Sequence, residues 1–266
     1  MAEFNTEAPR RVRVNRYVTP LREGGSLPAI AEADDGFLYV LKFRGAGQGP
    51  KALVAELICG ELARLAGFKI PEIVLAQLDE AFGRTEPDEE IQDLLKASTG
   101  LNLGLHYLSG SITYDPVSNK TDAQTASRLV WFDAWIMNVD RTFKNTNLLY
   151  WNRELWLIDH GAALYFHHNW TNWNDYTQRP FNPIKDHVLL PLATELEAAD
   201  NYMKQAFSRE RITEIVSLVP AAWLQDGYEG QTEAEVRRVY IDFLAGRLAH
   251  SSIFVKEAAH ARSQLV

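Results

Sequence analysis

The chain has 266 residues, of which 46% are hydrophobic, and this suits one large domain or two lobes with ample core. A net charge of −8 argues against direct nucleic-acid binding, because a phosphate backbone favours a basic surface. The single cysteine, Cys59, excludes an internal disulfide and a cysteine-rich zinc cluster. No apolar stretch reaches the length of a signal peptide or a membrane span, so we expect a cytoplasmic protein without a membrane anchor.

The first hundred residues are predicted to be rich in β-strands. Residues 1–9 are expected to form a flexible tail, and alternating polar and apolar residues indicate a strand directly after it. The segment "AIAEADDGFLYVLKF", residues 29–43, predicts a hairpin that turns at Asp34-Asp35-Gly36. A helix with apolar residues at helical spacing follows and ends near Gly67, and "KIPEIVLAQLD" predicts another strand.

Helical patterns dominate the second half of the chain. "TDAQTASRLVWFDAWIMN", residues 121–138, predicts a long helix, and the segment "TNLLYWNRELWLID" after it predicts a tight hairpin that turns at Asn152-Arg153. Further helices are expected at about 186–206, 208–218 and 231–249, the last two with Ser208 and Thr232 as N-caps.

This order of elements predicts an α+β protein of two lobes. Residues 10–108 are expected to form a small β-rich lobe with one main helix, together with the connector. Residues 109–266 are expected to form a larger, mostly helical lobe.

A lysine in the middle of a strong apolar strand requires an explanation. Lys42 lies in "YVLKF", where an ammonium without a partner costs desolvation energy. Glu56, early in the next helix, is a candidate partner, whereas Glu61 lies about 140° further round that helix. The alternative is an edge-strand lysine whose charged end reaches water.

A glycine pair lies between two predicted strands, at Gly24-Gly25-Ser26. A loop there would let backbone N–H groups approach a phosphate, as phosphoryl transfer requires. An ordinary turn explains the same residues. The glycines therefore point to nucleotide binding only in combination with Lys42.

Three oxygen-bearing side chains surround the predicted hairpin of the second half. Asp140 and Asn145 lie in the loop after the long helix, and Asp159 follows the second hairpin strand. A hairpin brings its ends together, so Asn145 and Asp159 are expected to be neighbours. Carboxylate and amide oxygens suit Mg²⁺, and Asp140 would be a base beside it. The alternative is that all three residues cap turns.

These residues match the motifs of a known family. "NVDRTFKN" and "LIDHG" resemble the catalytic loop and the metal-binding motif of HipA-like kinases, a bacterial branch of the protein-kinase-like fold that is related to phosphatidylinositol kinases. "YVLKF" and "ELICGELARLAGFKIPEI" resemble the lysine strand and the next helix of that family. The resemblance covers most of residues 15–165.

The resemblance implies an ATP- and Mg²⁺-dependent kinase with ATP between two lobes and the adenine near residues 102–108. Asp140 resembles the catalytic base, and Asn145 and Asp159 resemble the Mg²⁺ ligands. The residues implied to bind the nucleotide phosphates are Lys42, its partner Glu56 and the loop of Gly24, Gly25 and Ser26. Arg141 and Lys144, in the catalytic loop, are expected to neutralise charge near the γ-phosphate.

The chain also departs from the family pattern. Thr142 stands where a histidine is usual, and His160 replaces the phenylalanine of the common kinase motif. HipA toxins are much longer, so this chain resembles a compact stand-alone member. Autophosphorylation in the glycine loop of some relatives makes Ser26 a candidate modification site. A protein Ser or Thr hydroxyl is the acceptor that the family implies, and a small-molecule hydroxyl is the alternative.

Two other classes of function fit the same residues. One is a catalytically weak nucleotide-binding module that acts through a protein partner, although such a module has no use for Asp140. The other is a metal-dependent hydrolase that uses Asp140, Asp159, His160 and the His167-His168 pair. Adjacent histidines on a strand would point to opposite faces, which counts against this second alternative. The sequence carries no indication of oligomeric state.

Overall fold

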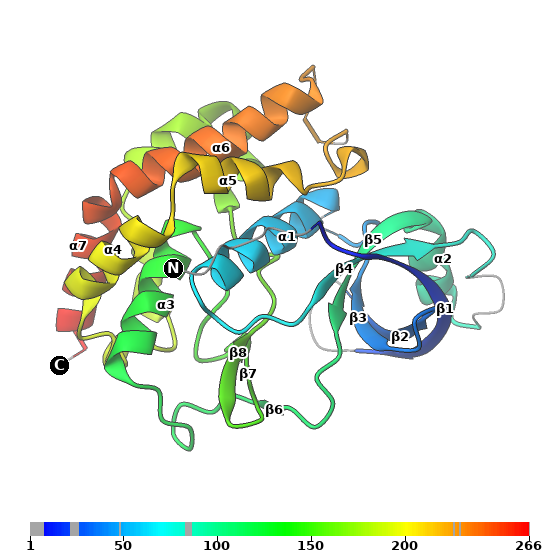
Figure 1. Cartoon of the computed structure of the whole chain (residues 1–266), viewed down its shortest axis with the longest axis horizontal. Coiled ribbons are helices and arrows are strands. Elements are labelled where there is room, and N and C mark those ends of the chain that lie inside the picture. The colour runs from blue at the N-terminus through cyan, green and yellow to red at the C-terminus, as the bar shows by residue number, and fades with distance from the viewer. Residues whose placement is uncertain are drawn as a thin grey trace.

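The computed structural model describes residues 8–21, 27–47, 49–82, 87–225, 227–228 and 230–265. Within these ranges, a strand-rich N-terminal part is followed by a helical C-terminal part (Figure 1). The predicted α+β class with a small β-rich lobe and a larger helical lobe is therefore confirmed. The predicted flexible tail, residues 1–9, falls almost entirely outside the described residues.

Five strands of the first lobe form a closed barrel in the order β1-β2-β3-β5-β4. These strands are β1 (Arg11–Pro20), β2 (Ala29–Ala33), β3 (Leu38–Lys42), β4 (Ile73–Leu78) and β5 (Gly100–His106). Neighbouring strands are antiparallel except β1 and β4, which pair in parallel and close the barrel. Closure protects strand edges that would otherwise be exposed.

The β2–β3 hairpin turns where the sequence predicts. Gly36 has a φ of 80°, a conformation that glycine adopts without steric cost, and its N–H donates to the carbonyl of Ala33 over 3.0 Å. In the following strand, β3, Tyr39 and Leu41 are buried inside the barrel, and Lys42 lies on the opposite, partly buried face with Val40. The turn therefore sets which strand residues face away from the barrel interior.

Helix α1 (Pro50–Leu65) connects the barrel to the helical lobe. Pro50 begins the helix, where its missing N–H leaves no bond unmade. The helix lies between the barrel and the C-terminal helices (Figure 1), and its buried side chains belong to the same apolar core as those helices. The barrel interior forms a second core, capped by α2 (Glu89–Ala97) through Leu95.

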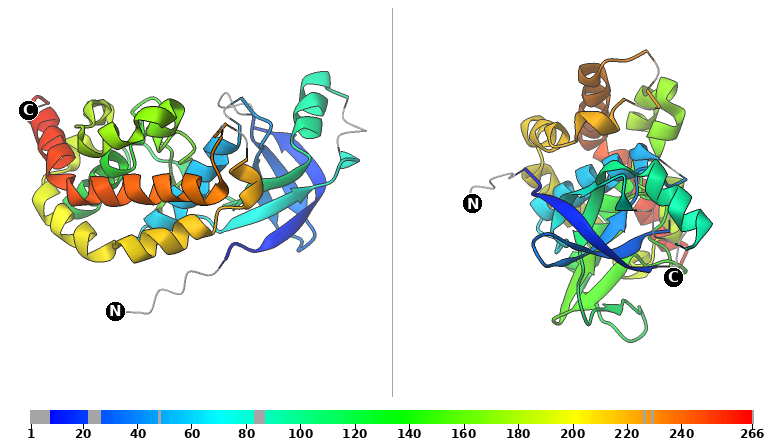
Figure 2. Two further views of the ribbon diagram at one scale, coloured as in Figure 1. Left: turned by 90° about the horizontal axis from the view of Figure 1, so that it is seen from above. Right: turned by 90° about the vertical axis from the view of Figure 1, so that its right-hand side faces the viewer.

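The helical lobe is built on α3 (Ala123–Trp135), with α4 (Leu196–Ala206), α5 (Arg209–Ser217), α6 (Glu233–Ala249) and α7 (Ser251–Ser263) around it. Figure 2 shows α5 and α6 running side by side, and contacts between them confirm this. The α3 aromatics Trp131 and Trp135 are fully buried, and the ring of Trp135 lies 4.4 Å from that of Phe207 between centroids.

The predicted N-caps are confirmed, but one predicted helix is wrong in its first half. Ser208 accepts from the Arg211 N–H, and Thr232 forms a capping box with Glu235. The helix expected from about 186 begins only at Leu196. Pro191 disfavours helical conformation in the preceding residue and lacks an N–H, so this stretch forms short 3₁₀ turns instead.

The hairpin after α3 has the predicted strands and turn. It consists of β7 (Leu148–Trp151) and β8 (Glu154–Leu157), and β6 (Ile112–Thr113) pairs with β7. Asn152 and Arg153 have φ values of 50° and 65°, the positive values of a type I′ turn. After β8 the chain runs through 3₁₀ turns, η2 (Tyr165–Gln178), which Asn169 and Asn172 interrupt with non-helical backbone angles. No described helix combines the length and apolarity that crossing a bilayer requires.

Candidate functional site

Charged side chains from three separate parts of the chain meet at Lys42. Its ammonium Nζ lies 2.6 Å from Oε2 of Glu56 on α1 and 2.5 Å from Oδ1 of Asp159 after β8. The side chains of Lys42 and Glu56 are 13% and 1% exposed, whereas that of Asp159 is 45% exposed. The lysine therefore joins the barrel, α1 and the helical lobe, and one of its two partners is open to solutes.

The environment keeps Lys42 and Glu56 charged. Burial alone would lower the pKa of Lys42, but the two carboxylates outweigh burial and raise that pKa above its ordinary value. Burial opposes the charged form of Glu56, and the Lys42 ammonium overcomes this and lowers its pKa to about 2. The backbone N–H of His160 donates to Oε2 of Glu56 over 2.9 Å. Glu56 is thus held from two sides as a buried anion.

The backbone around Asp159 aims its carboxylate at Lys42. Asp159 has a φ of 55°, and aspartate tolerates this left-handed conformation better than most residues. Just before it, the N–H of Ile158 donates to the carbonyl of Asn147 over 3.1 Å. The ends of the hairpin therefore meet as predicted, and they bring the loop that precedes β7 next to the residue that follows β8.

Asp140 lies in the loop between α3 and β7, where two amides hold its carboxylate. Nδ2 of Asn145 donates to Oδ2 of Asp140 over 2.9 Å, and Nδ2 of Asn147 donates to the same atom over 3.2 Å. Burial raises the pKa of Asp140, and the charge of Asp159 adds to the increase against the effect of the two amides. The carboxylate of Asp140 is thus held by two amides in a partly buried position.

The oxygen atoms in this region suit a hard divalent cation. Asn145 donates through its amide nitrogen, so its Oδ1 remains available as a ligand, and the accessible carboxylate of Asp159 is a second ligand. Among the described residues, no three His, Cys, Asp or Glu side chains gather as a metal cluster. A site for Mg²⁺ here would therefore use an amide oxygen and water beside its carboxylates, as Mg²⁺ commonly does.

The residues of the hydrolase alternative do not assemble. His160 is fully buried with its Nδ1 3.7 Å from Oε1 of Glu56, and His167 is buried with its Nδ1 3.2 Å from the hydroxyl of Tyr240. Burial lowers the pKa of His167. The histidines thus serve the packing of two different regions and leave no geometric basis for a histidine-rich metal site.

Arg141 lies elsewhere than expected. Its guanidinium is buried beneath the loop, where Nε donates to Oδ2 of Asp133 over 2.6 Å. This placement differs from the expectation that Arg141 neutralises charge near a phosphate. Lys144 is exposed in the same loop. The glycine loop of Gly24, Gly25 and Ser26 lies outside the described residues.

Sequence reasoning missed two asparagines of this loop. Asn138 accepts from the Asp140 N–H at Oδ1 over 3.1 Å, and Asn147 binds the Asp140 carboxylate. Both are buried, and Asn147 has a positive φ of 48°. The sequence does show an asparagine near each end of this loop, beside apolar residues. Asparagine is also common in ordinary turns, so its presence there did not indicate a role at Asp140.

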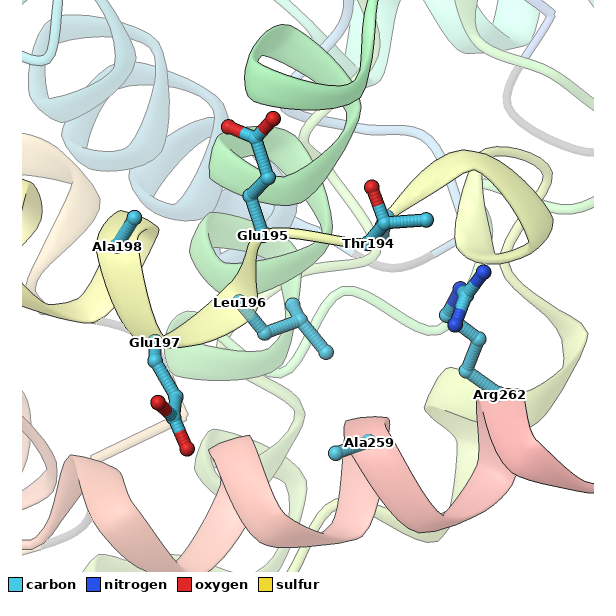
Figure 3. Close-up of a pocket in the computed structure, with 8 residues that line it drawn as sticks. Thr194, Glu195, Leu196, Glu197, Ala198, Ala259 and Arg262 are labelled. Carbon is cyan, nitrogen blue, oxygen red and sulfur yellow. The ribbon is translucent and has the colours of Figure 1, made fainter.

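A separate hollow of about 460 Å³ lies between the start of α4 and the end of α7 (Figure 3). Glu195 and Arg262 are among the residues that line it, and Nε of Arg262 donates to the carbonyl of Pro191 over 3.3 Å. The hollow shares no residue with the Lys42 cluster, and it carries none of the side chains predicted to act in chemistry.

The two lobes and the lysine held by carboxylates from both of them define a kinase-like protein. The sequence model of the HipA-like kinase family matches residues 14–252, and the chain belongs to this family. No curated protein sequence matches it.

The structure of one kinase supports the fold. The structure of the Helicobacter pylori proinflammatory kinase CtkA superposes with a TM-score of 0.55 at 13% identity, over 97% of this chain and 99% of that one. A Golgi casein kinase with Mn and ADP bound gives a TM-score of 0.47 at 12% identity, over 97% of this chain and 75% of that one. The similarity to CtkA extends over essentially the whole of both chains, so the kinase-like fold is shown for both lobes.

Proposed function

We propose that this protein is an ATP- and Mg²⁺-dependent phosphotransferase that moves the γ-phosphoryl group to a hydroxyl acceptor. The observation that carries the proposal is the contact of Lys42 with the buried Glu56 and the accessible Asp159 at the same time. Phosphoryl transfer needs a cation fixed near the phosphates and oxygen ligands beside it, and this cluster supplies both.

Glu56 and Asp159 have different parts in this arrangement. Glu56 is buried and bonded to both Lys42 and the His160 N–H, so it fixes where the ammonium lies. Asp159 faces solvent, so a phosphate oxygen can replace it as the second partner of Lys42. Lys42 would then bind phosphate while Asp159 is released to act as a metal ligand.

Asn145 and Asp159 would hold the Mg²⁺ ion, which neutralises charge on the β- and γ-phosphates when it is bound. Asp140 would orient the acceptor hydroxyl and accept its proton as the hydroxyl oxygen bonds to the γ-phosphorus and the bond to the β-phosphate oxygen breaks. The raised pKa of Asp140 strengthens it as a base. The two amides that bind its carboxylate support activity over a catalytically weak module, which has no use for a positioned base.

The acceptor that we propose is a Ser or Thr hydroxyl of a protein, which follows the family, and a small-molecule hydroxyl is the alternative. A cytoplasmic location, where Mg-ATP is abundant, goes with this proposal. We also propose Lys144, exposed in the loop of Asp140, as a residue that attracts phosphate. The glycine loop of Gly24, Gly25 and Ser26 remains the predicted cover of the nucleotide.

Incubation with γ-labelled ATP, Mg²⁺ and a cell lysate depleted of nucleotides tests the proposal. The parent should label an acceptor, and Asp140→Asn should lower turnover by about 10²–10⁴-fold while leaving ATP affinity largely intact. Asp175→Asn is the matched control, because Asp175 is exposed in η2 and pairs only with Arg179 at 3.2 Å among the described ion pairs. Absence of transfer by the parent would refute the proposed function. Full activity of Asp140→Asn would refute the role of Asp140.

A further inference from the structure

A second charged cluster lies within the helical lobe, under the loop that carries Asp140. Its centre is Asp133 of α3, which is fully buried. The Asp133 carboxylate accepts from Nε of Arg141 over 2.6 Å, from Nε2 of His187 over 2.9 Å and from Nδ2 of Asn138 over 3.0 Å. Three separate donors thus converge on one carboxylate that has no contact with solvent.

The protonation of His187 follows from its two neighbours. The N–H of Leu189 donates to Nδ1 of His187 over 3.0 Å, so Nδ1 is an acceptor and Nε2 carries the proton that Asp133 receives. Burial lowers the pKa of His187 despite this carboxylate, which keeps the ring neutral. Arg141 is therefore the cation that balances Asp133.

Two chains of hydrogen bonds lead from Asp133 to Asp140. In the first, Asn138 donates to Asp133 and accepts from the Asp140 N–H. In the second, Arg141 donates to Asp133 and to the carbonyl of Asn147, and Asn147 donates to the Asp140 carboxylate. Both the backbone and the side chain of Asp140 are thereby tied to one buried group.

The second chain also reaches Ile158, the residue before Asp159. The carbonyl of Asn147 accepts from Arg141 and from the N–H of Ile158. The residue after His187 binds the loop from the other side, because the N–H of Val188 donates to the carbonyl of Arg141 over 3.1 Å. Hydrogen bonds that start at one buried carboxylate therefore lead to Asp140 and to the residue that precedes Asp159.

Stability alone is a weak reason for such a cluster. Charges inside a protein lose their hydration, and buried ion pairs replaced by apolar residues of similar volume often leave stability unchanged or improved. Geometry is a stronger reason, since displacement of a reacting group by about 1 Å costs about 10²-fold in rate.

We propose that Asp133, assisted by His187, is a positioning residue that holds the loop and the carboxylate of Asp140 in place. Its catalytic consequence rests on the proposed phosphotransferase function. Because Asp133→Asn leaves the Arg141 charge buried and can prevent folding, the test uses His187. His187→Leu removes the donor to Asp133, and His187→Gln offers an amide N–H in its place.

The kinetic test measures kcat and KM for ATP in both variants, per mole of folded protein, with and without Asp140→Asn. His187→Leu should lower kcat by about 10–100-fold and change KM for ATP by less than about threefold. His187→Gln should recover most of the loss. In the Asp140→Asn background, His187→Leu should lower kcat by less than about threefold, because its effect passes through Asp140. The control is Val236→Ala, a core substitution on α6 that should leave kcat per folded molecule unchanged.

Equal fractional losses in the two backgrounds, or an unchanged kcat in His187→Leu, would overturn the proposal. A second readout needs no activity. Amide hydrogen exchange across residues 138–147 should accelerate in His187→Leu and not in Val236→Ala, and unchanged exchange there would overturn the proposal by itself. If the parent transfers no phosphoryl group, the proposed function fails, and hydrogen exchange still decides whether Asp133 and His187 hold the loop.

Discussion

The charged clusters around Lys42 and around Asp133 differ in how far solvent reaches them. The Lys42 cluster joins both lobes, and one of its members, Asp159, is 45% exposed. The Asp133 cluster lies within one lobe, and all its members are buried. An ion pair open to water can exchange a partner for a ligand at low cost, whereas a closed one resists change. The first cluster therefore suits binding and the second suits positioning.

The largest expected effect on stability comes from breaking the ion pair of Lys42 and Glu56. Lys42→Met leaves Glu56 as a buried charge without its ammonium, which should lower the free energy of unfolding by about 3–5 kcal/mol. Urea unfolding measures this. Lys96→Met is the matched control, because Lys96 is exposed on α2 and its pair with Asp93 at 3.4 Å should contribute less than about 1 kcal/mol. Similar losses in both variants would show that the ammonium of Lys42 does not stabilise the buried charge of Glu56.

A somewhat smaller effect is expected at Asp159, the exposed member of the Lys42 cluster. Mg-ADP at about 100 times its Kd should stabilise the parent by about 2.7 kcal/mol, and Asp159→Ala should abolish this increase. A thermal-shift series with and without Mg²⁺ measures the difference as a change in Tm. Asp186→Ala, an exposed carboxylate in the same lobe, should respond as the parent does. A full Mg²⁺-dependent shift in Asp159→Ala would refute its role as a metal ligand.

Acid should affect the two clusters alike. Burial opposes ionisation of both Glu56 and Asp133, but Lys42 and Arg141 respectively outweigh it and lower each pKa to about 2. A lowered carboxyl pKa adds stability above the pKa of the unfolded chain and loses it as pH falls toward the folded pKa. Between about pH 6 and about pH 3, the free energy of unfolding should thus fall by about 2 kcal/mol through Glu56 and by about 1 kcal/mol through Asp133.

Urea unfolding across this pH range measures the loss. The double variant Lys42→Met/Glu56→Gln lacks one of the two carboxyls, so its stability should fall less steeply with acid than that of the parent. An equal slope in the two proteins would contradict the low pKa of Glu56.

Local sequence patterns predicted much of the Lys42 cluster. The charge of Lys42 in an apolar strand predicted a partner, the place of Glu56 early in the next helix made it the candidate, and the hairpin turn brought the end of β8 back to the loop before β7. In each case residues close in sequence fix the geometry, through a turn or a helical period.

Local sequence patterns did not predict the Asp133 cluster or the closure of the barrel. Asp133 lies among apolar residues of a helix, and nothing near it in sequence marks His187 as its partner 54 residues on. The parallel pairing of β1 with β4 likewise joins strands that are far apart in the chain. Long-range pairing depends on the packing of the whole fold, and a single sequence does not display it.

The placement of α1 limits how the protein can be divided. This helix follows β3 in the chain, but its buried side chains, Leu57 and Leu62 among them, continue the core of the helical lobe. A fragment that starts at the connector would therefore lack the helix that covers this apolar surface, and the surface would be open to aggregation. Domain exchange between relatives should accordingly transfer α1 with the helices that it packs against, although the chain order assigns it to the barrel.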